Sequence, residues 1–298
     1  MSARPDGSRL RGPTNEKLRC VHFQRLATDS MSAFYTSWNW TGFIQPQIDR
    51  IIAAGANAIK WYSTSTPVLV GGLSQTVFEQ RIGQFLAYCQ TNGLRVYWGL
   101  TDSYSSESHN SAEQTVNLSV LRLLDTYPCV VGVDLWNEGV QSAGLATVVT
   151  WLQTYLPAMR SAAPGLPLTC SISPNVDMTA VNGLQPYVDF YDFHPYALTS
   201  TTAGHPSSSD FDTLRASLSW KPWIQGECGV NSAWTSTQQQ NGVQALGDIV
   251  GWDCYGSVLY ASQDGTVDTA LEKLYDASTP PVARSFMLAP FQTWPSRN

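Results

Sequence analysis

The chain has 298 residues, of which 43% are hydrophobic and 13% charged, so it can bury a large core and does not have the composition of a disordered protein. A net charge of -6 and the lack of a basic stripe argue against a nucleic acid as partner. No apolar run approaches the roughly 20 residues that span a bilayer. We therefore expect a monomer that binds neither nucleic acid nor membrane.

The cysteines and the N-terminus bear on the compartment. The six cysteines are widely scattered and form no CxxC pair, so we expect buried free thiols rather than a disulfide framework. Residues 1–12 are polar and basic and contain no apolar segment typical of a signal peptide. Two locations remain open: the cytosol, and secretion with the leader removed.

Eight short apolar runs recur along the chain and have the composition of buried strands. They are rich in Val, Ile, Tyr and Trp, and Gly, Pro or Asn bound them. The predicted strands are 18–23, 58–62, 94–100, 130–136, 167–173, 188–194, 222–227 and 256–262.

Between these runs lie longer stretches in which apolar residues recur at helical spacing. The predicted helices are 45–54, 77–91, 111–127, 145–163, 211–218, 238–250 and 266–275. After the fifth strand the pattern is weakest, and only residues 179–184 predict a short turn of helix.

This alternation of strand and helix predicts an α/β fold with a parallel sheet. Closed on itself, such a sheet forms a (β/α)₈ TIM barrel, here with a core of about residues 18–276. A doubly wound sheet is the competing fold, but no GxGxxG follows the first strand. No repeat or linker is visible, so the sequence predicts a single catalytic domain over residues 1–298.

Two glutamates stand at the carboxyl ends of predicted strands, where a barrel places its active site. Glu138 ends the fourth run, VVGVDLWNE, and Glu227 ends the seventh, PWIQGE. Either residue, taken alone, could instead cap the following helix. Together they lie three strands apart in a ring of eight, across the mouth from each other. Glycoside hydrolysis needs such a pair, one carboxyl group protonated and one ionised.

Three short motifs, in this order, resemble those of the clan A glycoside hydrolases and of their family 5 in particular. WNEG around Glu138 resembles the acid/base motif, HPY at 194–196 resembles the family's His-x-Tyr, and QGECG around Glu227 resembles the nucleophile motif. The resemblance implies a retaining β-glycosidase, endo- or exo-acting, that cleaves a β-glucan or β-mannan. No cofactor is expected, and the four histidines are too far apart in the sequence, without HExxH or paired spacing, to predict a catalytic metal.

The resemblance further implies a role for each matching residue. Glu138 would be the acid/base and Glu227 the nucleophile. Asn137 would bind the 2-hydroxyl of the sugar at the cleavage point. Tyr196 would hydrogen-bond or face the nucleophile, and His194 would line the same floor, although a plain core role for His-Pro-Tyr stays open.

The chain departs from the family pattern at three strand ends. Lys60 in NAIKWY stands where the family has an Arg, so it could hold Glu227 ionised but without a planar bidentate fork. The segment GLTDSYS lacks the usual His, for which Asp102 or Tyr104 would substitute. Tyr260 in VLYASQ stands where a Trp platform is usual. These departures favour a distant branch of family 5 or a sister family.

Aromatic side chains near the strand ends are candidates for stacking on sugar rings, since flat indoles suit the apolar faces of sugars. The candidates are Trp38, Trp40, Trp61, Trp136 and Trp234. Trp98 lies inside a strand and is expected in the core. His22 has a structural role as readily as a ligand contact, and His109 and His205 are expected to be solvated.

Two rival functions remain open. A barrel that binds carbohydrate without cleaving it would have no need of both glutamates. An aldolase-like barrel could use Lys60 as a Schiff-base lysine, but no phosphate-binding glycine-rich loop follows the seventh strand. No HExxH and no GxSxG motif is present to predict a zinc or serine hydrolase.

Overall fold

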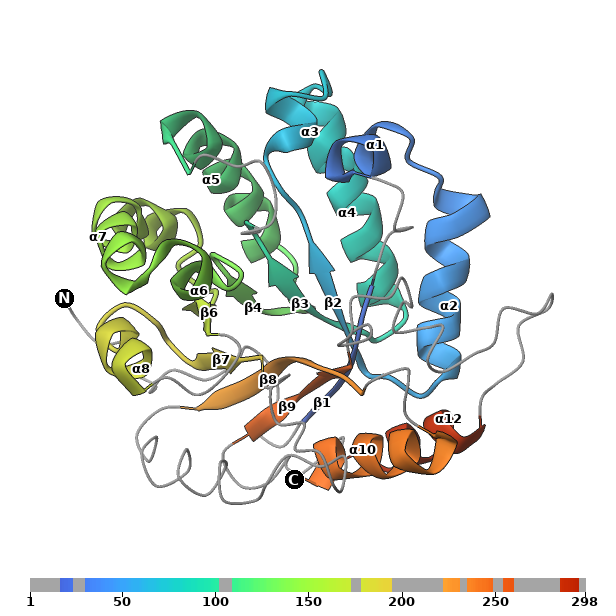
Figure 1. Ribbon diagram of the computed structural model, residues 1–298. Helices are drawn as coiled ribbons and strands as arrows, with labels where there is room; N and C mark the ends of the chain where they lie inside the picture. Colours follow the sequence, from blue (N-terminus) through green and yellow to red (C-terminus); the bar gives the residue numbers. More distant parts are fainter. Residues whose placement is uncertain are drawn as a thin grey trace.

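The protein is represented by a computed structural model in which strands lie at the centre and helices surround them (Figure 1). The structure describes residues 17–23, 30–101, 109–172, 178–194, 222–230, 235–248, 254–259 and 285–294.

The described strands form a single parallel sheet. They are β1 (Leu18–His22), β2 (Ala58–Tyr62), β3 (Arg95–Gly99), β4 (Val130–Asp134), β5 (Leu168–Thr169), β6 (Ser171–Ile172), β7 (Tyr191–Phe193), β8 (Trp223–Cys228) and β9 (Cys254–Leu259). Their order in the sheet is β5-β4-β3-β2-β1-β9-β8-β7-β6. Each strand falls within or within two residues of a run predicted from the sequence.

The two outermost strands of that order, β5 and β6, are neighbours in the chain and only Cys170 separates them. β5 pairs with β4 through Val133 and Leu168, whereas β6 pairs with β7 through Ser171 and Asp192. The two short strands are thus the halves of the fifth predicted strand, and this segment closes the ring. The predicted α/β barrel is confirmed.

Helices follow the strands and form the outer layer. The described ones are α1 (Met31–Thr36), the π-helix η1 (Trp40–Ile44), α2 (Gln45–Ala53), α3 (Thr66–Leu69), α4 (Gln75–Thr91), α5 (Ser111–Asp125), α6 (Gly139–Ala143), α7 (Leu145–Ala162), α8 (Met178–Leu184), α10 (Ser236–Asp248) and α12 (Ser285–Gln292). The predicted helices at 211–218 and 266–275 lie outside the described residues.

Polar residues fix where the long helices begin. The Ser74 hydroxyl accepts a hydrogen bond from the backbone N–H of Val77 at the start of α4. At the start of α5, Asn110 and Glu113 cap each other's backbone in a reciprocal capping box. Such caps satisfy N–H groups that have no partner within the helix. They set the register in which the apolar face of each helix meets the sheet.

The interior of the barrel has an apolar lower layer and a charged upper layer. The lower layer is a cluster of buried side chains: Leu18, Cys20, Ala58, Tyr97, Val131, Phe190, Ile224 and Val258. Because side chains alternate along a strand, Lys60 shares the inward face of β2 with Ala58, and Asp192 on β7 points to the same side as Phe190, which precedes that strand. Both charged residues are completely buried. The strand pattern therefore delivers charged groups into the barrel above an apolar floor.

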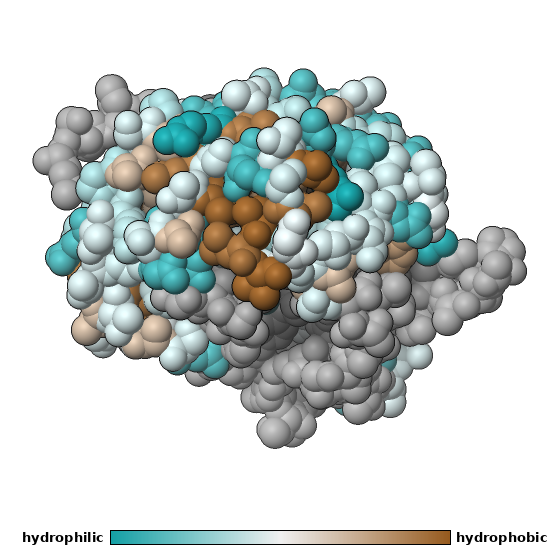
Figure 2. All heavy atoms as spheres, turned by 90° about the horizontal axis from the view of Figure 1, so that it is seen from above, coloured by the Kyte–Doolittle hydropathy of each residue, from teal (hydrophilic) through white to brown (hydrophobic). Residues whose placement is uncertain are grey.

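The face seen from above in Figure 2 shows a gathering of hydrophobic residues. α3 lies at the corresponding edge of Figure 1. Among the described residues, the large hydrophobic side chains that are exposed are Leu69 and Val70, at the end of α3. No helix among these residues is long and apolar enough to cross a membrane. The cysteines whose side chains are described, Cys20, Cys89, Cys129, Cys170 and Cys228, are buried free thiols as expected.

Candidate active site

Glu138 occupies a strained position four residues after the end of β4. Its backbone is left-handed, with φ 51° and ψ 31°, a conformation that costs a non-glycine residue roughly 1–3 kcal/mol. It stands at the N-terminal cap of α6, but its side chain makes no capping hydrogen bond. Its backbone N–H donates to the Ser171 hydroxyl (2.8 Å), and its carboxylate Oε1 lies 2.9 Å from Nδ1 of His194. The backbone strain thus turns the carboxyl group toward the barrel axis rather than toward the helix.

Glu227 lies on β8 and is almost completely buried. Its Oε1 lies 3.2 Å from the Lys60 ammonium and accepts a 2.7 Å hydrogen bond from the Tyr62 hydroxyl. Its Oε2 lies 3.5 Å from Nδ1 of His194. The carboxylate is therefore surrounded by donors and positive charges contributed by β2 and by the end of β7.

These neighbours decide the protonation state of Glu227. Burial alone would raise the pKa of the carboxyl group, because it penalises the charged form. The charges of His194 and Lys60, a smaller effect of His22, and the hydrogen bond from Tyr62 outweigh burial and lower the pKa of Glu227 to about 2. Glu227 is thus ionised throughout the ordinary pH range.

Lys60 is fully buried and makes two contacts on β8. Its ammonium donates to the carbonyl of Gly226 (3.0 Å) as well as to Glu227. Burial works to lower the pKa of Lys60, but the carboxylates of Glu227, Asp192 and Asp134 outweigh it and the pKa is raised. A Schiff-base lysine must be a neutral amine when it attacks a carbonyl carbon, so this charged lysine does not suit the aldolase-like alternative.

Tyr62 is a site residue that the sequence reasoning missed. It follows Lys60 by two positions on β2 and so points to the same side of the sheet, a signal that strand alternation could have supplied. Gly99 on β3 leaves room for it, since a Cβ at Gly99 would lie 1.9 Å from the Tyr62 ring. The Tyr62 oxygen also lies 2.6 Å from Oδ1 of Asn137, so the hydroxyl stands between Asn137 and Glu227 and can donate its one proton to either.

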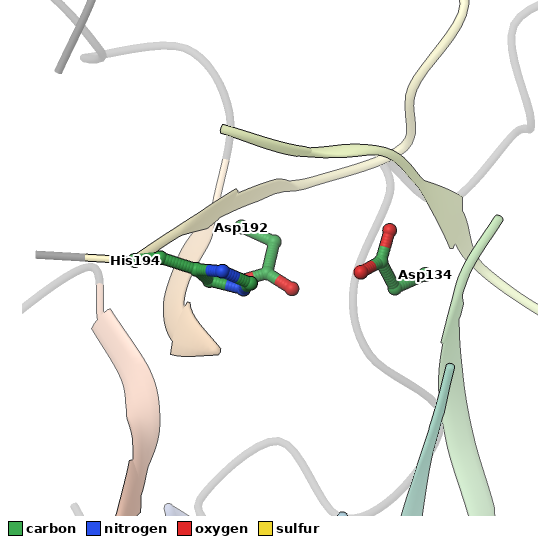
Figure 3. A group of neighbouring side chains, drawn as sticks. All are labelled: Asp134, Asp192 and His194. Carbon is green, nitrogen blue, oxygen red and sulfur yellow. The ribbon is translucent and has the colours of Figure 1, made fainter. Parts of the chain in front are cut away.

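The two glutamates lie close together across the barrel mouth. One carboxylate oxygen from each, and a ring nitrogen of His194, all lie within 4.8 Å of one another. Beneath them Asp134, Asp192 and His194 form a second group with the same mutual spacing, drawn in Figure 3. Each of the two groups has ligand atoms of the kind that could hold a metal ion.

Electrostatic coupling extends through this lower group. Burial, and then the neighbouring Asp192, raise the pKa of Asp134 to about 7, although Lys60 and His194 act in the opposite direction. Burial lowers the pKa of His194, yet the carboxylates of Glu227 and Asp192 prevail over burial and Lys60 and raise it to about 10. His194 is therefore an imidazolium at neutral pH.

The structure brings together five of the residues singled out from the sequence: Asn137, Glu138, Glu227, His194 and Lys60. Their mutual contacts, given above, all lie at the mouth of the barrel. The other expected site residues Tyr196, Trp234 and Tyr260, with Asp102, Tyr104 and His205, lie outside the described residues.

Two of the expected sugar platforms, Trp61 and Trp136, are buried instead, which corrects the expectation, whereas Trp38 is partly exposed and stays a prediction. Trp61 points away from Lys60, is 1% exposed, and donates its indole N–H to the Tyr35 hydroxyl (2.7 Å). Trp38 stacks on Tyr35 and donates to the Gln84 side chain on α4. Trp136, 3% exposed, is covered by His109 and Trp151. Trp61 and Trp136 have no open ring face for a sugar.

The remaining histidine and tryptophan expectations divide in the same way. Trp98 is buried in the core, as expected. His109 was expected to be solvated, but it packs against Trp136 with ring centroids 3.8 Å apart, and burial lowers its pKa. His22 lies beside Tyr62, with ring centroids 5.3 Å apart, and its charge acts on Glu227, so it belongs to the site.

No family profile and no curated protein sequence matches the chain. Solved structures match its fold. The structure of GH5_18 from Streptomyces cattleya in complex with GlcNAc aligns with a TM-score of 0.69 and 11% identity, over 94% of this chain and 81% of its own. The exo-β-1,4-mannosidase Op5Man5 from Opitutaceae bacterium strain TAV5 aligns with a TM-score of 0.67 and 14% identity, over 91% of this chain and 61% of its own. An endo-1,4-β-mannanase from Eisenia fetida aligns with a TM-score of 0.64 and 13% identity, over 98% of this chain and 95% of its own.

At these identities the likeness shows the fold alone. It is the fold of the family 5 enzymes that the sequence motifs resemble. This chain spans less than two thirds of the length of the mannosidase. The activities named for these proteins are theirs, and what this chain does has to be argued from its own site.

Proposed function

We propose that this protein is a retaining β-glycoside hydrolase of the family 5 type, with Glu227 as nucleophile and Glu138 as acid/base. The observation that carries the proposal is a pair of buried glutamates after β4 and on β8, with one oxygen of each within 4.8 Å. Retaining glycosidases hold their carboxyl groups about 5–5.5 Å apart, and inverting ones about 6.5–9.5 Å. The closeness of the two groups favours direct attack by a carboxylate over attack by an interposed water.

The surroundings of each carboxyl group favour the proposed roles. Glu227 has Lys60, Tyr62 and His194 around it and a pKa of about 2, so it is the permanently ionised group that a nucleophile has to be. The carboxylate of Glu138 lies 2.9 Å from Nδ1 of His194 and stands across the mouth from Glu227. The resemblance of WNEG to the acid/base motif gives Glu138 the second role.

The reaction would run in two displacements. Glu227 attacks the anomeric carbon, the bond from that carbon to the glycosidic oxygen breaks, and Glu138 gives its proton to the departing oxygen. In the second step Glu138 takes a proton from a water molecule, whose oxygen attacks the same carbon and releases Glu227. Asn137, beside Glu138 and with the Tyr62 hydroxyl between it and Glu227, would bind the 2-hydroxyl of the same sugar.

We propose a β-glucan or β-mannan as the substrate class. The motif resemblance to family 5 supports it, as does the fold shared with a β-mannosidase and a β-mannanase. We further propose that the chain acts as one catalytic domain and as a monomer. The rival function, a barrel that binds a glycan without cleaving it, gives no reason for holding Glu227 ionised beside Glu138.

The direct test is a screen of aryl β-glycosides, β-glucans and β-mannans with the purified protein. We expect turnover of at least one substrate, and loss of that turnover in Glu227→Gln, which keeps the size of the side chain. Glu79→Gln on α4, outside the barrel mouth, is the matched control and should remain active. Binding of a polysaccharide without turnover of any β-glycoside would support the rival function instead.

A further inference from the structure

Beneath the two glutamates, three fully buried polar atoms converge without hydrogen-bond partners. They are Oδ2 of Asp134, Oδ1 of Asp192 and Nε2 of His194, from residues that are 0% exposed. Figure 3 shows the two carboxylates and the imidazole turned toward the same space. Polar atoms buried without partners are costly, so their convergence on one place points to something shared among them.

The other polar atoms of these residues are already engaged. The Tyr97 hydroxyl donates to Oδ2 of Asp192, and the backbone N–H of Ser171 donates to Oδ1 of Asp134 (3.0 Å). Nδ1 of His194 faces Glu138. Asp192 also packs against the backbone of β8, where a Cβ at Gly226 would lie 1.8 Å from its Oδ1. Each residue is therefore fixed, with one atom left over that faces the same gap.

The charges around this gap do not balance. Among the described residues, the titratable groups that act on it include Lys60 on β2, Tyr97 on β3, Cys170 between β5 and β6, and Glu227 on β8. Above them, Glu138 faces Nδ1 of His194, and His22 on β1 acts on Glu227. Tyr97 and Cys170 stay neutral, because burial raises the pKa of each well above its usual value. Lys60 pairs with Glu227, which leaves two carboxylates in the gap itself, of Asp134 and Asp192, facing one cation, His194. One further positive charge would balance these three buried residues.

We propose that this charge is a proton on Oδ2 of Asp134, and that Asp134, Asp192 and His194 form a buried hydrogen-bonded relay. Asp134 is the neutral acid and donates to Oδ1 of Asp192. That oxygen also accepts from Nε2–H of His194, which lies 3.6 Å away and needs only a small approach. One proton thereby supplies partners for all three atoms. The raised pKa values of Asp134 and His194 agree with this assignment.

The relay gives Asp134 and Asp192 a positioning role in the proposed reaction. Asp192 holds His194 as an imidazolium whose Nδ1–H lies 2.9 Å from Glu138 and 3.5 Å from Glu227. In the resting enzyme Glu227 is the ionised glutamate, and in the glycosyl-enzyme Glu138 is. The Nδ1–H of His194 can therefore donate to whichever glutamate is charged at each stage. This last step rests on the proposed function, whereas the relay itself does not.

A metal ion bound by the same three atoms is the alternative occupant. Two aspartates and a histidine are a reasonable ligand set, and an ion would also supply the missing charge. The proton is favoured because the neighbouring Lys60 would repel an ion, and because a metal ligand must be a deprotonated imidazole nitrogen.

The test uses two isosteric variants of the full chain, Asp134→Asn and Asp192→Asn, and reads the charge of His194 by NMR of ¹⁵N-labelled histidine. The His194 signal is assigned by its absence in His194→Gln. At pH 8 we expect a doubly protonated ring in the wild type and in Asp134→Asn, whose amide still donates to Asp192. In Asp192→Asn we expect a neutral ring. A neutral His194 in the wild type at pH 8 would overturn the relay, even if no variant folds.

Thermal unfolding supplies a second readout for Asp134. Its pKa is raised from 3.8 to about 7 in the fold, so the stability it gives the wild type is present below pH 3.8 and is lost as the pH rises toward 7. Asp134→Asn cannot lose this stability as the pH rises, because its amide does not titrate. The Tm of the variant relative to the wild type should therefore rise from pH 4 to pH 7 and then level off. A difference that does not change with pH would contradict the assignment.

Metal analysis of the purified protein completes the test. One equivalent of a metal in the wild type that is absent from Asp134→Asn would overturn the proton assignment in favour of the ion. None of these readouts depends on turnover. The relay can therefore fail while the glycosidase proposal stands, and the glycosidase proposal can fail while the relay stands.

Discussion

The two glutamates at the barrel mouth have the same side chain but differ in what surrounds them. Glu227 receives a hydrogen bond from Tyr62, an ion pair from Lys60 and the field of His194. Glu138 has a strained left-handed backbone that is tied to Ser171, and its carboxyl group faces His194. The comparison teaches that the charge of Glu227 is set by its neighbours, since strand β2 places both Lys60 and Tyr62 beside it.

The largest effect that the comparison predicts is that of removing Glu227. Glu227→Ala should lower turnover of every substrate on the order of 10⁴-fold or more, because no covalent intermediate can form without the nucleophile. Initial rates on an aryl β-glycoside and on a polysaccharide would measure it. Loss confined to the polysaccharide would show that Glu227 is not the nucleophile.

The next effect is that of Lys60, which is expected to keep Glu227 ionised. Removing an opposite charge within hydrogen-bonding distance typically raises a carboxyl pKa by about 1–3 units. With a starting pKa of about 2, the acidic limb of the kcat/KM profile of Lys60→Met should move up to roughly pH 3–5.

Lys60→Arg is the matched control for that experiment, because it restores a cation of similar length. Its acidic limb should stay closer to that of the wild type than the limb of Lys60→Met does. An active Lys60→Met protein with an unchanged profile would make Lys60 a structural residue only.

A smaller effect is expected from Tyr62→Phe, which removes one hydroxyl and keeps the ring against Gly99. A hydrogen bond to a charged group contributes about 1.5–3 kcal/mol, so kcat/KM should fall by roughly 10- to 160-fold. The acidic limb should rise by less than in Lys60→Met. An equal or larger shift in Tyr62→Phe would mean that the hydrogen bond, rather than the charge, fixes the state of Glu227.

The smallest effect on activity should come from the tryptophan next to Lys60. Trp61→Phe lies on the outward face of β2, so it should lower the free energy of unfolding by about 0.5–3 kcal/mol and leave KM within error. Urea unfolding and steady-state kinetics would measure the two quantities. A raised KM in a stably folded variant would return Trp61 to the site.

Most of the barrel could be predicted from the sequence because buried parallel strands have short, continuous apolar sequences. The predicted bounds of 58–62 and 130–136 differ from β2 and β4 by at most two residues. The split of the fifth strand at Cys170 could not be seen, because it depends on which neighbour each half pairs with.

The site was predictable only where a polar residue interrupts or ends a strand. Glu138, Glu227 and Lys60 stand out against apolar neighbours, and the structure brings them together. Aromatic residues do not stand out against apolar neighbours, because the sequence around a tryptophan at a strand end is the same whether its side chain faces the mouth or the helices. Strand alternation separates the two: Tyr62 shares the face of Lys60, and Trp61 does not.

The measurement that tests the central claim most directly is the stereochemistry of azide rescue. Glu138→Ala should still form the glycosyl-enzyme from an aryl β-glycoside with a good leaving group, and azide should then attack it to give the β-glycosyl azide. In Glu227→Ala azide takes the place of the missing carboxylate and should give the α-glycosyl azide by a single inversion. NMR of the anomeric protons distinguishes the two products. Opposite anomers in this sense are what the asymmetry of the two glutamates predicts, and exchanged anomers would reverse their roles and contradict it.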